Sequence, residues 1–360
     1  MNAGRACAEC LRRPWLLGRL AGHLDIVRGR AADLLDGADE DLIEAVGGRA
    51  ARELRAEYDA FDADGYRERC AVAELELLCR CDAAYPPSLW SLDAEPAVLH
   101  VAGGLERFLE FAALTSVAVV GARRASPYAL ENAHSLGRGL ASAAVTVVSG
   151  MAAGIDTAAH EGALDARGRS IAVLGSAPER PYPPAGRRLH RRLLHAGAVV
   201  SELGPGVRAR RWMFPARNRI IAALAEMTVV VAARVGSGAM LTVAEARKLG
   251  RKVGGVPGQT TAPLSWGPHE VVTLGGALIR GAADVLSHLD GEHPAPLPRC
   301  RRPQDPALVP LFEALAEGYA PELAFAEASL DAEQGLAALA ALEMRGHVRR
   351  LAGGRYCIVP

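Results

Sequence analysis

The feature that most constrains this chain is a series of short apolar runs between residues 116 and 258. They read SVAVVG, VTVVSG, SIAVLG, AVVSE, TVVVAA and VGGVPG, and each is rich in Val, Ile or Gly. Each has the length of a strand, and helix-like patterns separate most of them. Continuous apolar strands that alternate with helices are typical of a parallel sheet covered on both faces. The sequence therefore predicts a doubly wound, Rossmann-like α/β domain with a mostly parallel sheet over residues 115–288.

The flanking segments have different patterns. Residues 1–80 show apolar residues at helical spacing in RPWLLGRLAGHLDIV and DEDLIEAVGG, which indicates a small N-terminal helical domain. Residues 81–114 are predicted to form a Pro-rich extended connector, and residues 289–306 a linker rich in Pro and charge. Residues 307–360 are expected to fold as three helices and a hairpin, the outline of a winged-helix domain.

Particular residues support the C-terminal prediction. Leu336, Leu339 and Leu342 lie at helical spacing, and Gly353-Gly354 favours a tight hairpin turn between two short strands.

The overall composition excludes few classes of function. Acidic and basic residues balance at 41 each, so only local charge can indicate a nucleic-acid partner. No segment has the pattern of a membrane span, and the N-terminus lacks the apolar core of a signal peptide. A cytoplasmic protein without membrane contact is expected.

The cysteines raise the question of a metal. Cys7 and Cys10 form a C-x-x-C motif, and Cys79 and Cys81 lie close together in the sequence. A structural zinc site usually takes two pairs at defined spacing. Free thiols in a reducing compartment are the favoured interpretation, and no metal is expected.

A ligand site is expected where the parallel strands end. In open α/β sheets, ligands bind beyond the carboxyl ends of the strands, and loops such as GARRAS, SGMAAGID and RVGSGAML follow those ends here. Glycines let backbone amides approach an anion, and helix N-termini add partial positive charge. Neither a G-x-G-x-x-G nor a phosphate-binding G-x-x-x-x-G-K-[ST] motif is present, so no nucleotide cofactor is expected. A phosphate held by separate loops is favoured.

The local charge pattern indicates which kind of ligand contains that phosphate. No acidic residue lies between Glu202 and Glu226, and this gap holds arginines interleaved with Trp212 and Phe214. The arginines are Arg208, Arg210, Arg211, Arg217 and Arg219. Guanidinium groups for phosphates and aromatic rings for bases are typical of single-strand binding. The alternative is a solvated loop whose two aromatic residues pack in the core.

Other polar residues near strand ends have assigned roles. Arg123 and Arg124 directly follow the first strand and are expected to bind phosphate rather than form surface ion pairs. Asp156 is expected to order its loop, and His160 to pack or form a hydrogen bond. No catalytic residue is assigned.

Several of these segments together resemble the DprA/Smf family of DNA-processing proteins. The matching blocks include VAVVGARRASPYAL, VVSGMAAGIDTAAHEGAL, WMFPARNRIIAAL and GSGAMLTVAEARKLGRKVGGVPG, in the family's order. The resemblance implies a non-enzymatic homodimer that binds and protects single-stranded DNA and loads the RecA recombinase, especially in natural transformation. The DNA-binding positions it implies are Gly121, Arg123, Ser149, Gly150, Phe214, Arg217, Asn218, Gly236, Ser237 and Gly238.

The chain departs from the family pattern in its loops. Ala122 stands where a Ser is usual, which removes one hydroxyl donor, and Ala153 stands where an Arg is usual. Close to the end of the domain, SWGPHEVV replaces a Gly-Thr-Asn-like turn and contains His269. The missing Arg bears on the strength of DNA binding.

Two other functions stay open. A nucleotide phosphoribohydrolase on a related fold would use Glu245 in GSGAMLTVAEA, although the P-G-G of such enzymes is missing. A winged-helix transcriptional regulator would use Arg345, Arg349 and Arg350, which lie at a helix end and wing rather than along a recognition helix.

Overall fold

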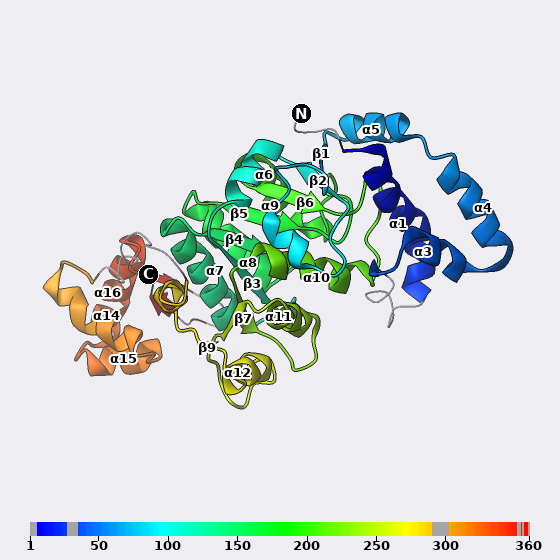
Figure 1. Cartoon of the computed structure of the whole chain (residues 1–360). Coiled ribbons are helices and arrows are strands. Elements are labelled where there is room, and N and C mark those ends of the chain that lie inside the picture. Colours follow the sequence, from blue (N-terminus) through cyan, green and yellow to red (C-terminus); the bar gives the residue numbers. More distant parts are fainter. Residues whose placement is uncertain (1–5, 27–34, 290–301, 351–353, 355, 359–360) are drawn as a thin grey trace. The chain divides into compact units, whose positions relative to one another are not determined.

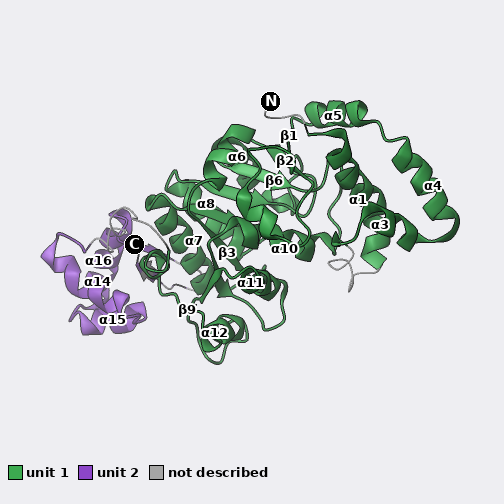
Figure 2. Cartoon of the chain, in the orientation of Figure 1, with its two compact units in different colours: residues 1–294 green, residues 295–360 purple. Residues whose placement is uncertain are grey.

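The computed structural model describes residues 6–26, 35–289, 302–350, 354 and 356–358. The chain forms two compact units, residues 1–294 and residues 295–360 (Figure 2). The two units are considered separately below.

The first unit is built on a nine-stranded sheet with the order β1-β2-β6-β5-β4-β3-β7-β8-β9 (Figure 1). The strands are β1 (Glu76–Cys79), β2 (Val98–Ala102), β3 (Ser116–Gly121), β4 (Thr146–Ser149), β5 (Ser170–Val173), β6 (Ala198–Ser201), β7 (Met227–Ala232), β8 (Lys252–Gly255) and β9 (Ala277–Leu278). The six strands predicted from the apolar runs are β3 to β8, and all six are confirmed.

The order of the strands makes the sheet doubly wound. From β3 the chain adds β4, β5 and β6 in parallel on one side, then returns to place β7 and β8 in parallel on the other side. The direction of winding therefore reverses between the neighbouring strands β3 and β7. Among the described strands of this sheet, β1 and β2 break the parallel pattern, because β2 pairs antiparallel with both β1 and β6. The fold prediction of a mostly parallel, Rossmann-like sheet is confirmed.

Helices cover both faces of this sheet. One face carries α6 (Leu105–Ala112), α10 (Met213–Leu224), α11 (Gly238–Lys248) and α12 (Trp266–Thr273). The other face carries α7 (Pro127–Ser142), α8 (Ile155–Asp165) and α9 (Arg187–Ala196). The central strands are buried along nearly their whole length, which explains why they are continuously apolar rather than alternating. Helix α7 has a regular N-terminus: Pro127 occupies its first turn, and the Ser126 hydroxyl accepts the Ala129 amide at 3.2 Å.

The N-terminal residues form α1 (Ala8–Ile26), α3 (Asp39–Val46), α4 (Gly48–Asp59) and α5 (Ala63–Val72). These helices confirm the helical character expected of the segment. However, β1 at the end of this segment joins the sheet as an edge strand, and α1 and α5 pack into the same apolar cluster as α9.

The prediction of an extended connector over 81–114 is wrong in its second half. The first half of this segment contains a 3-10 turn, η2 (Pro87–Ser91), and the second half contains β2 and α6, which join the sheet and its covering layer. The run VLHVA is short and follows several prolines, so it gives a weak local signal. Pairing with β6 and complete burial make it a strand.

The second unit contains α14 (Val309–Ala316), α15 (Pro321–Glu327), α16 (Ala332–Met344) and the antiparallel pair β10 (Val348–Arg350) and β11 (Tyr356–Ile358). This is the predicted order of three helices and a hairpin. Leu339 and Leu342 are buried in its core, whereas Leu336 is 61% exposed and does not belong to it. Gly353 of the predicted turn and residues 290–301 of the predicted linker lie outside the described residues.

Among the helices of the described ranges, none combines the length and the apolarity needed to span a membrane.

Candidate nucleic-acid interface

A groove lies at the carboxyl ends of β3 and β7, the point where the sheet changes its direction of winding. The strand-end loops of β3, β4 and β7 and the helices α10 and α11 line it. The described residues that line it include four arginines and one carboxylate, that of Asp156. The arginines are Arg123, Arg124, Arg217 and Arg234. The expected position for a ligand in such a fold is this edge of the sheet.

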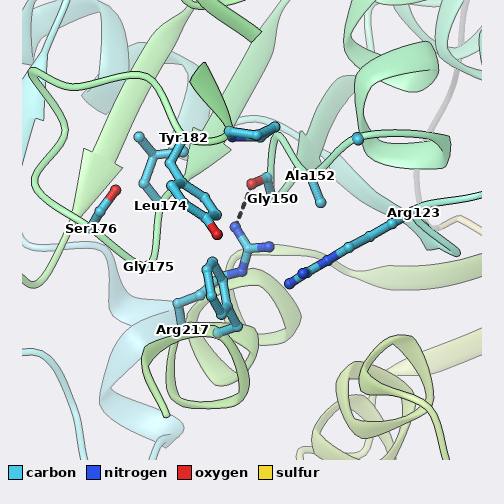
Figure 3. A pocket seen from close by; sticks show the side chains of 11 residues that line it. Arg123, Gly150, Ala152, Leu174, Gly175, Ser176, Tyr182 and Arg217 are labelled. Carbon is cyan, nitrogen blue, oxygen red and sulfur yellow. Dashed lines mark hydrogen bonds between the residues drawn. The ribbon is translucent and has the colours of Figure 1, made fainter. Parts of the chain in front are cut away.

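A second, adjoining pocket is formed by an aromatic and guanidinium stack. The Arg123 guanidinium lies over the Phe214 ring at 4.9 Å from its centroid, and the Phe214 and Tyr182 rings are 5.3 Å apart. Figure 3 shows Arg123 and Tyr182 at the rim of this pocket. Arg123 is exposed and, within the described residues, forms no ion pair, so the alternative of a surface ion pair is not what the structure shows.

Arg217 sits at the bottom of both pockets and is almost completely buried. Its Nη1 donates to the carbonyl oxygen of Gly150 at 2.5 Å and to that of Val173 (Figure 3), and its Nη2 lies 3.8 Å from the Asp156 carboxylate. Burial lowers the pKa of Arg217 to about 10, against the opposing effect of Asp156. Arg217 therefore links the ends of β4 and β5 through hydrogen bonds and also lines the groove.

Gly150 lies next to Arg217 at the bottom of the two pockets, and Ser149 directly precedes it in the chain. A Cβ on Gly150 would collide with the Arg217 guanidinium, so only glycine allows that close approach. Ser149 is fully buried and its hydroxyl donates to the Val119 carbonyl at 2.6 Å. The side chain of Ser149 therefore ties β4 to β3 and does not face the groove.

The loop before α11 forms the opposite wall. Asn218 on α10 donates from Nδ2 to the Gly238 carbonyl at 3.0 Å and fixes the position of this loop. Gly236 turns the chain with a φ of +71°, a conformation that favours glycine. The Ser237 hydroxyl is buried without a hydrogen-bond partner in the described chain, at the N-terminus of an eleven-residue helix. Free amides and a helix dipole there attract an anion.

The arginine-rich segment divides into two kinds of residue. Trp212 is buried, and its Nε1 donates to the Ala21 carbonyl at 3.0 Å, so for this residue the alternative of a core side chain is correct. Arg219 forms a two-pronged ion pair with Glu202, at 2.8 and 2.6 Å, and is also structural. Arg208, Arg210 and Arg211 remain exposed.

Asp156 and His160 have the ordering roles expected of them. Asp156 accepts the Ala152 amide at 3.2 Å, and its burial raises its pKa despite the nearby Arg217. His160 is fully buried with its Nδ1 at 2.7 Å from the Ser170 hydroxyl. The carboxylate of the groove is thus engaged by the chain itself.

Glu245 does not line this groove. It belongs to a separate depression with Lys248, Arg219 and Leu92. The carboxylate that a phosphoribohydrolase would use therefore does not meet the Arg123–Phe214 stack.

Tyr182 is a residue of the stack that sequence reasoning missed. In the sequence its Y-P-P context indicates no more than a strand-end loop. The signal that could have found it is an aromatic residue in a loop already expected at the ligand edge, since aromatic rings serve as stacking platforms.

The fold and the groove together define a class: doubly wound α/β proteins with an arginine-lined groove at the switch point of the sheet. Residues 76–290 match the family model described as DNA recombination-mediator protein A. The chain belongs to this family, the DprA/Smf DNA-processing proteins.

Relatives and solved structures agree with this assignment. The chain is 38% identical over 209 residues to DNA processing protein DprA of Streptococcus pneumoniae, covering 58% of this chain and 72% of that protein. It is 38% identical over 206 residues to protein Smf of Escherichia coli, covering 57% and 54%. The X-ray structure of DprA from S. pneumoniae superposes with a TM-score of 0.63 at 31% identity, over 79% of this chain and 97% of that one.

Two further comparisons set the limits of the likeness. A structure of DNA processing protein A from Helicobacter pylori, which concerns its single-stranded DNA binding mode, shares the fold with a TM-score of 0.53 at 24% identity, over 60% of this chain and 95% of that one. The chain spans about half the length of several curated relatives it matches, 53% for one from Mycobacterium tuberculosis.

Proposed function

We propose that this chain binds single-stranded DNA in the groove at the switch point of its sheet. The observation that carries the proposal is the stack of Arg123, Phe214 and Tyr182 beside the unpartnered Ser237 hydroxyl at the start of α11, within the described part of the chain. Guanidinium groups and helix amides suit phosphates, and the aromatic rings suit unpaired bases, which a duplex does not present.

The charges of the groove support an anionic ligand. Among the described residues that line it are four arginines and the Asp156 carboxylate, which faces Arg217 and a backbone amide rather than the groove alone. Ala153, where the family pattern has an Arg, is exposed beside the stack. Because this position carries no guanidinium, the exposed positive charge comes from Arg123, Arg124 and Arg234.

Membership of the family supports a proposal for the wider role. The chain would act without catalysis in the cytoplasm, as a homodimer that protects single-stranded DNA and loads the RecA recombinase in transformation and recombination. The position of Glu245 outside the groove favours binding over a phosphoribohydrolase reaction.

The first test is the salt dependence of DNA binding. Arg123→Ala should weaken binding of a labelled single-stranded oligonucleotide and reduce the slope of log K against log salt concentration by about 1, because the variant neutralises one phosphate fewer. Fluorescence anisotropy over a salt series measures both quantities. The matched control is Arg49→Ala, which removes an exposed arginine on α4. An unchanged slope for Arg123→Ala would show that this residue does not bind phosphate.

The second arm distinguishes the alternative functions. A titration with a duplex of the same sequence should show much weaker binding than with the single strand, whereas a winged-helix regulator would prefer the duplex. Incubation with nucleoside monophosphates should release no free base. A gel-shift titration with and without the recombinase then tests whether the chain recruits it to DNA.

A further inference from the structure

Four cysteines meet at one point of the first unit, away from the DNA groove. Cys7 lies directly before α1 and Cys10 in its first turn, while Cys79 ends β1 and Cys81 follows two residues later. Their sulfur atoms all lie within 4.8 Å of one another. The sequence alone favours free thiols, because the second pair has an unusual spacing and lies far from the first.

The distances fit a tetrahedron of sulfurs around one ion. The Cys7 and Cys81 sulfurs are 4.0 Å apart, and those of Cys10 and Cys81 are 3.6 Å apart. A zinc ion with Zn–S bonds of about 2.3 Å in tetrahedral geometry separates its ligand sulfurs by about 3.8 Å. The Cys10 amide also donates to the Cys7 sulfur at 3.4 Å, which favours a thiolate at that position.

Other uses of four cysteines fit less well. A disulfide joins two sulfurs at about 2.0 Å, whereas all four cysteines are free thiols in the structure. An iron–sulfur cluster binds its cysteines through different iron atoms, which spreads their sulfurs further apart than one shared ion does. Four mutually adjacent thiols select a single soft-ligand metal ion.

We propose that Cys7, Cys10, Cys79 and Cys81 bind one zinc ion. All four positions of a tetrahedral ion are then taken by protein ligands, which is typical of a structural rather than a catalytic site. Four thiolates around Zn²⁺ leave a negative charge, and this charge lies at the N-terminus of α1 and close to Arg80. Both features stabilise it.

The position indicates what the ion does. Cys10 and Cys79 belong to the same apolar cluster, and β1 is the edge strand of the sheet. The ion would fasten the first turn of α1 to the end of that strand, across a loop of about 70 residues. Closing a long loop constrains the unfolded chain, so the N-terminal helices are held against the sheet.

The first experiment measures the metal content of the full chain. Protein purified without chelator and with a thiol reductant should contain one equivalent of zinc by plasma mass spectrometry, and Cys10→Ser or Cys79→Ser should lose it. The matched control is Cys70→Ala, which removes a buried cysteine outside the cluster and should retain the zinc. Metal at the same level in the control and the ligand variants, or none in the wild-type chain, would overturn the proposal.

The second experiment does not depend on replacing a buried residue. Cys81 is exposed, so Cys81→Ser should fold and bind zinc more weakly than the wild-type chain. Removal of the metal from the wild-type chain by a chelator should lower the unfolding temperature by on the order of 5 °C, and re-added zinc should restore it. Cobalt substitution should give the visible absorption of a tetrahedral thiolate site. No thermal shift, no cobalt spectrum, or thiols found in disulfides under reducing conditions would each contradict zinc binding.

Discussion

Arg123 and Arg217 are both arginines at the predicted DNA edge, yet burial gives them different roles. Arg123 is exposed and stacks on Phe214, so its donors face the solvent and are available to a phosphate. Arg217 is 7% exposed, its Nη1 donates to two carbonyl groups, and its Nε donates to the Asn218 side chain. The electrostatic contribution of Arg123 to DNA binding should therefore be separable by mutation, whereas that of Arg217 is mixed with stability.

The contribution of the Tyr182 ring to this stack can be tested by mutation. Tyr182→Ala should weaken single-strand binding by roughly 1–3 kcal/mol, because a stacking platform is removed, with little change in the salt slope. Tyr182→Phe should bind like the wild-type chain, since it keeps the ring. Anisotropy titrations of both variants measure their affinities for the single strand. An equal loss of affinity in the two variants would assign the effect to the hydroxyl instead of the ring.

The buried histidines predict how stability depends on pH. Burial lowers the pKa of His160 to about 3 and that of His100 to about 4, from 6.5 for an exposed histidine. A lowered pKa means that the folded state favours the neutral ring, so the stabilisation is complete above pH 6.5 and is lost as the pH falls below it.

Urea unfolding between pH 7 and pH 5 measures this loss. Each histidine should reduce the free energy of unfolding by about 1.4 kcal/mol per pH unit once the pH is well below 6.5. His160→Asn should remove one share of the pH dependence. A free energy that stays constant from pH 7 to pH 5 would contradict the burial of neutral rings.

At the scale of elements, α10 and α11 contact each other and both line the groove. Asn218 of α10 holds the Gly238 carbonyl, which fixes the position of the first turn of α11. The free amides at the start of α11 and the buried, unpartnered Ser237 hydroxyl then lie together at the lining of the groove. Two helices that are far from the β3 and β4 loops in sequence thus line the same groove as those loops.

Ser237→Ala tests that site. The Ser237 side chain makes no capping hydrogen bond, so the substitution should change the free energy of unfolding by less than about 0.5 kcal/mol. DNA binding should weaken by roughly 1.5–3 kcal/mol, the value of a hydrogen bond to a charged group. Thermal melts and binding titrations on the same variant give both numbers. A loss of stability with unchanged affinity would make Ser237 an ordinary helix cap.

At the scale of the whole molecule, the groove belongs entirely to the first unit. Every residue of the Arg123 stack and of the α11 site lies within residues 1–294, and the second unit has an apolar core of its own. The proposed single-strand binding in this groove therefore involves no residue of the second unit.

A shortened chain tests this division. Residues 1–294 alone should unfold cooperatively and bind a short single strand within about 0.5 kcal/mol of the full chain, as expected for independent sites. Calorimetry and anisotropy measure the two properties. A large loss of affinity would show that the second unit adds DNA contacts of its own.

Much of the fold could be predicted because its strands are short, apolar and separated by clear turn signals. The runs at β3 to β8 lie between two layers of helices, and that burial is written directly in their composition. The strand-end loops followed from the topology rule for ligand sites, which is why Arg123, Phe214 and the α11 loop could be predicted together.

Tertiary structure decided between residues that the local sequence does not distinguish. Trp212 and Phe214 are two residues apart with the same interleaved arginines, but only packing against α1 buries the first and leaves the second at the groove. β2 became a strand through its pairing with β6, and Arg219 became structural through Glu202.

The sequence by itself thus determined the doubly wound sheet and the edge at which a ligand is expected, because burial and strand direction are local consequences of residue pattern. Only the folded chain decided which polar groups are used internally and which remain free, because that depends on partners distant in sequence. The four cysteines show the same rule: their meeting depends on β1 pairing at the edge of the sheet, which brings Cys79 and Cys81 to the start of α1.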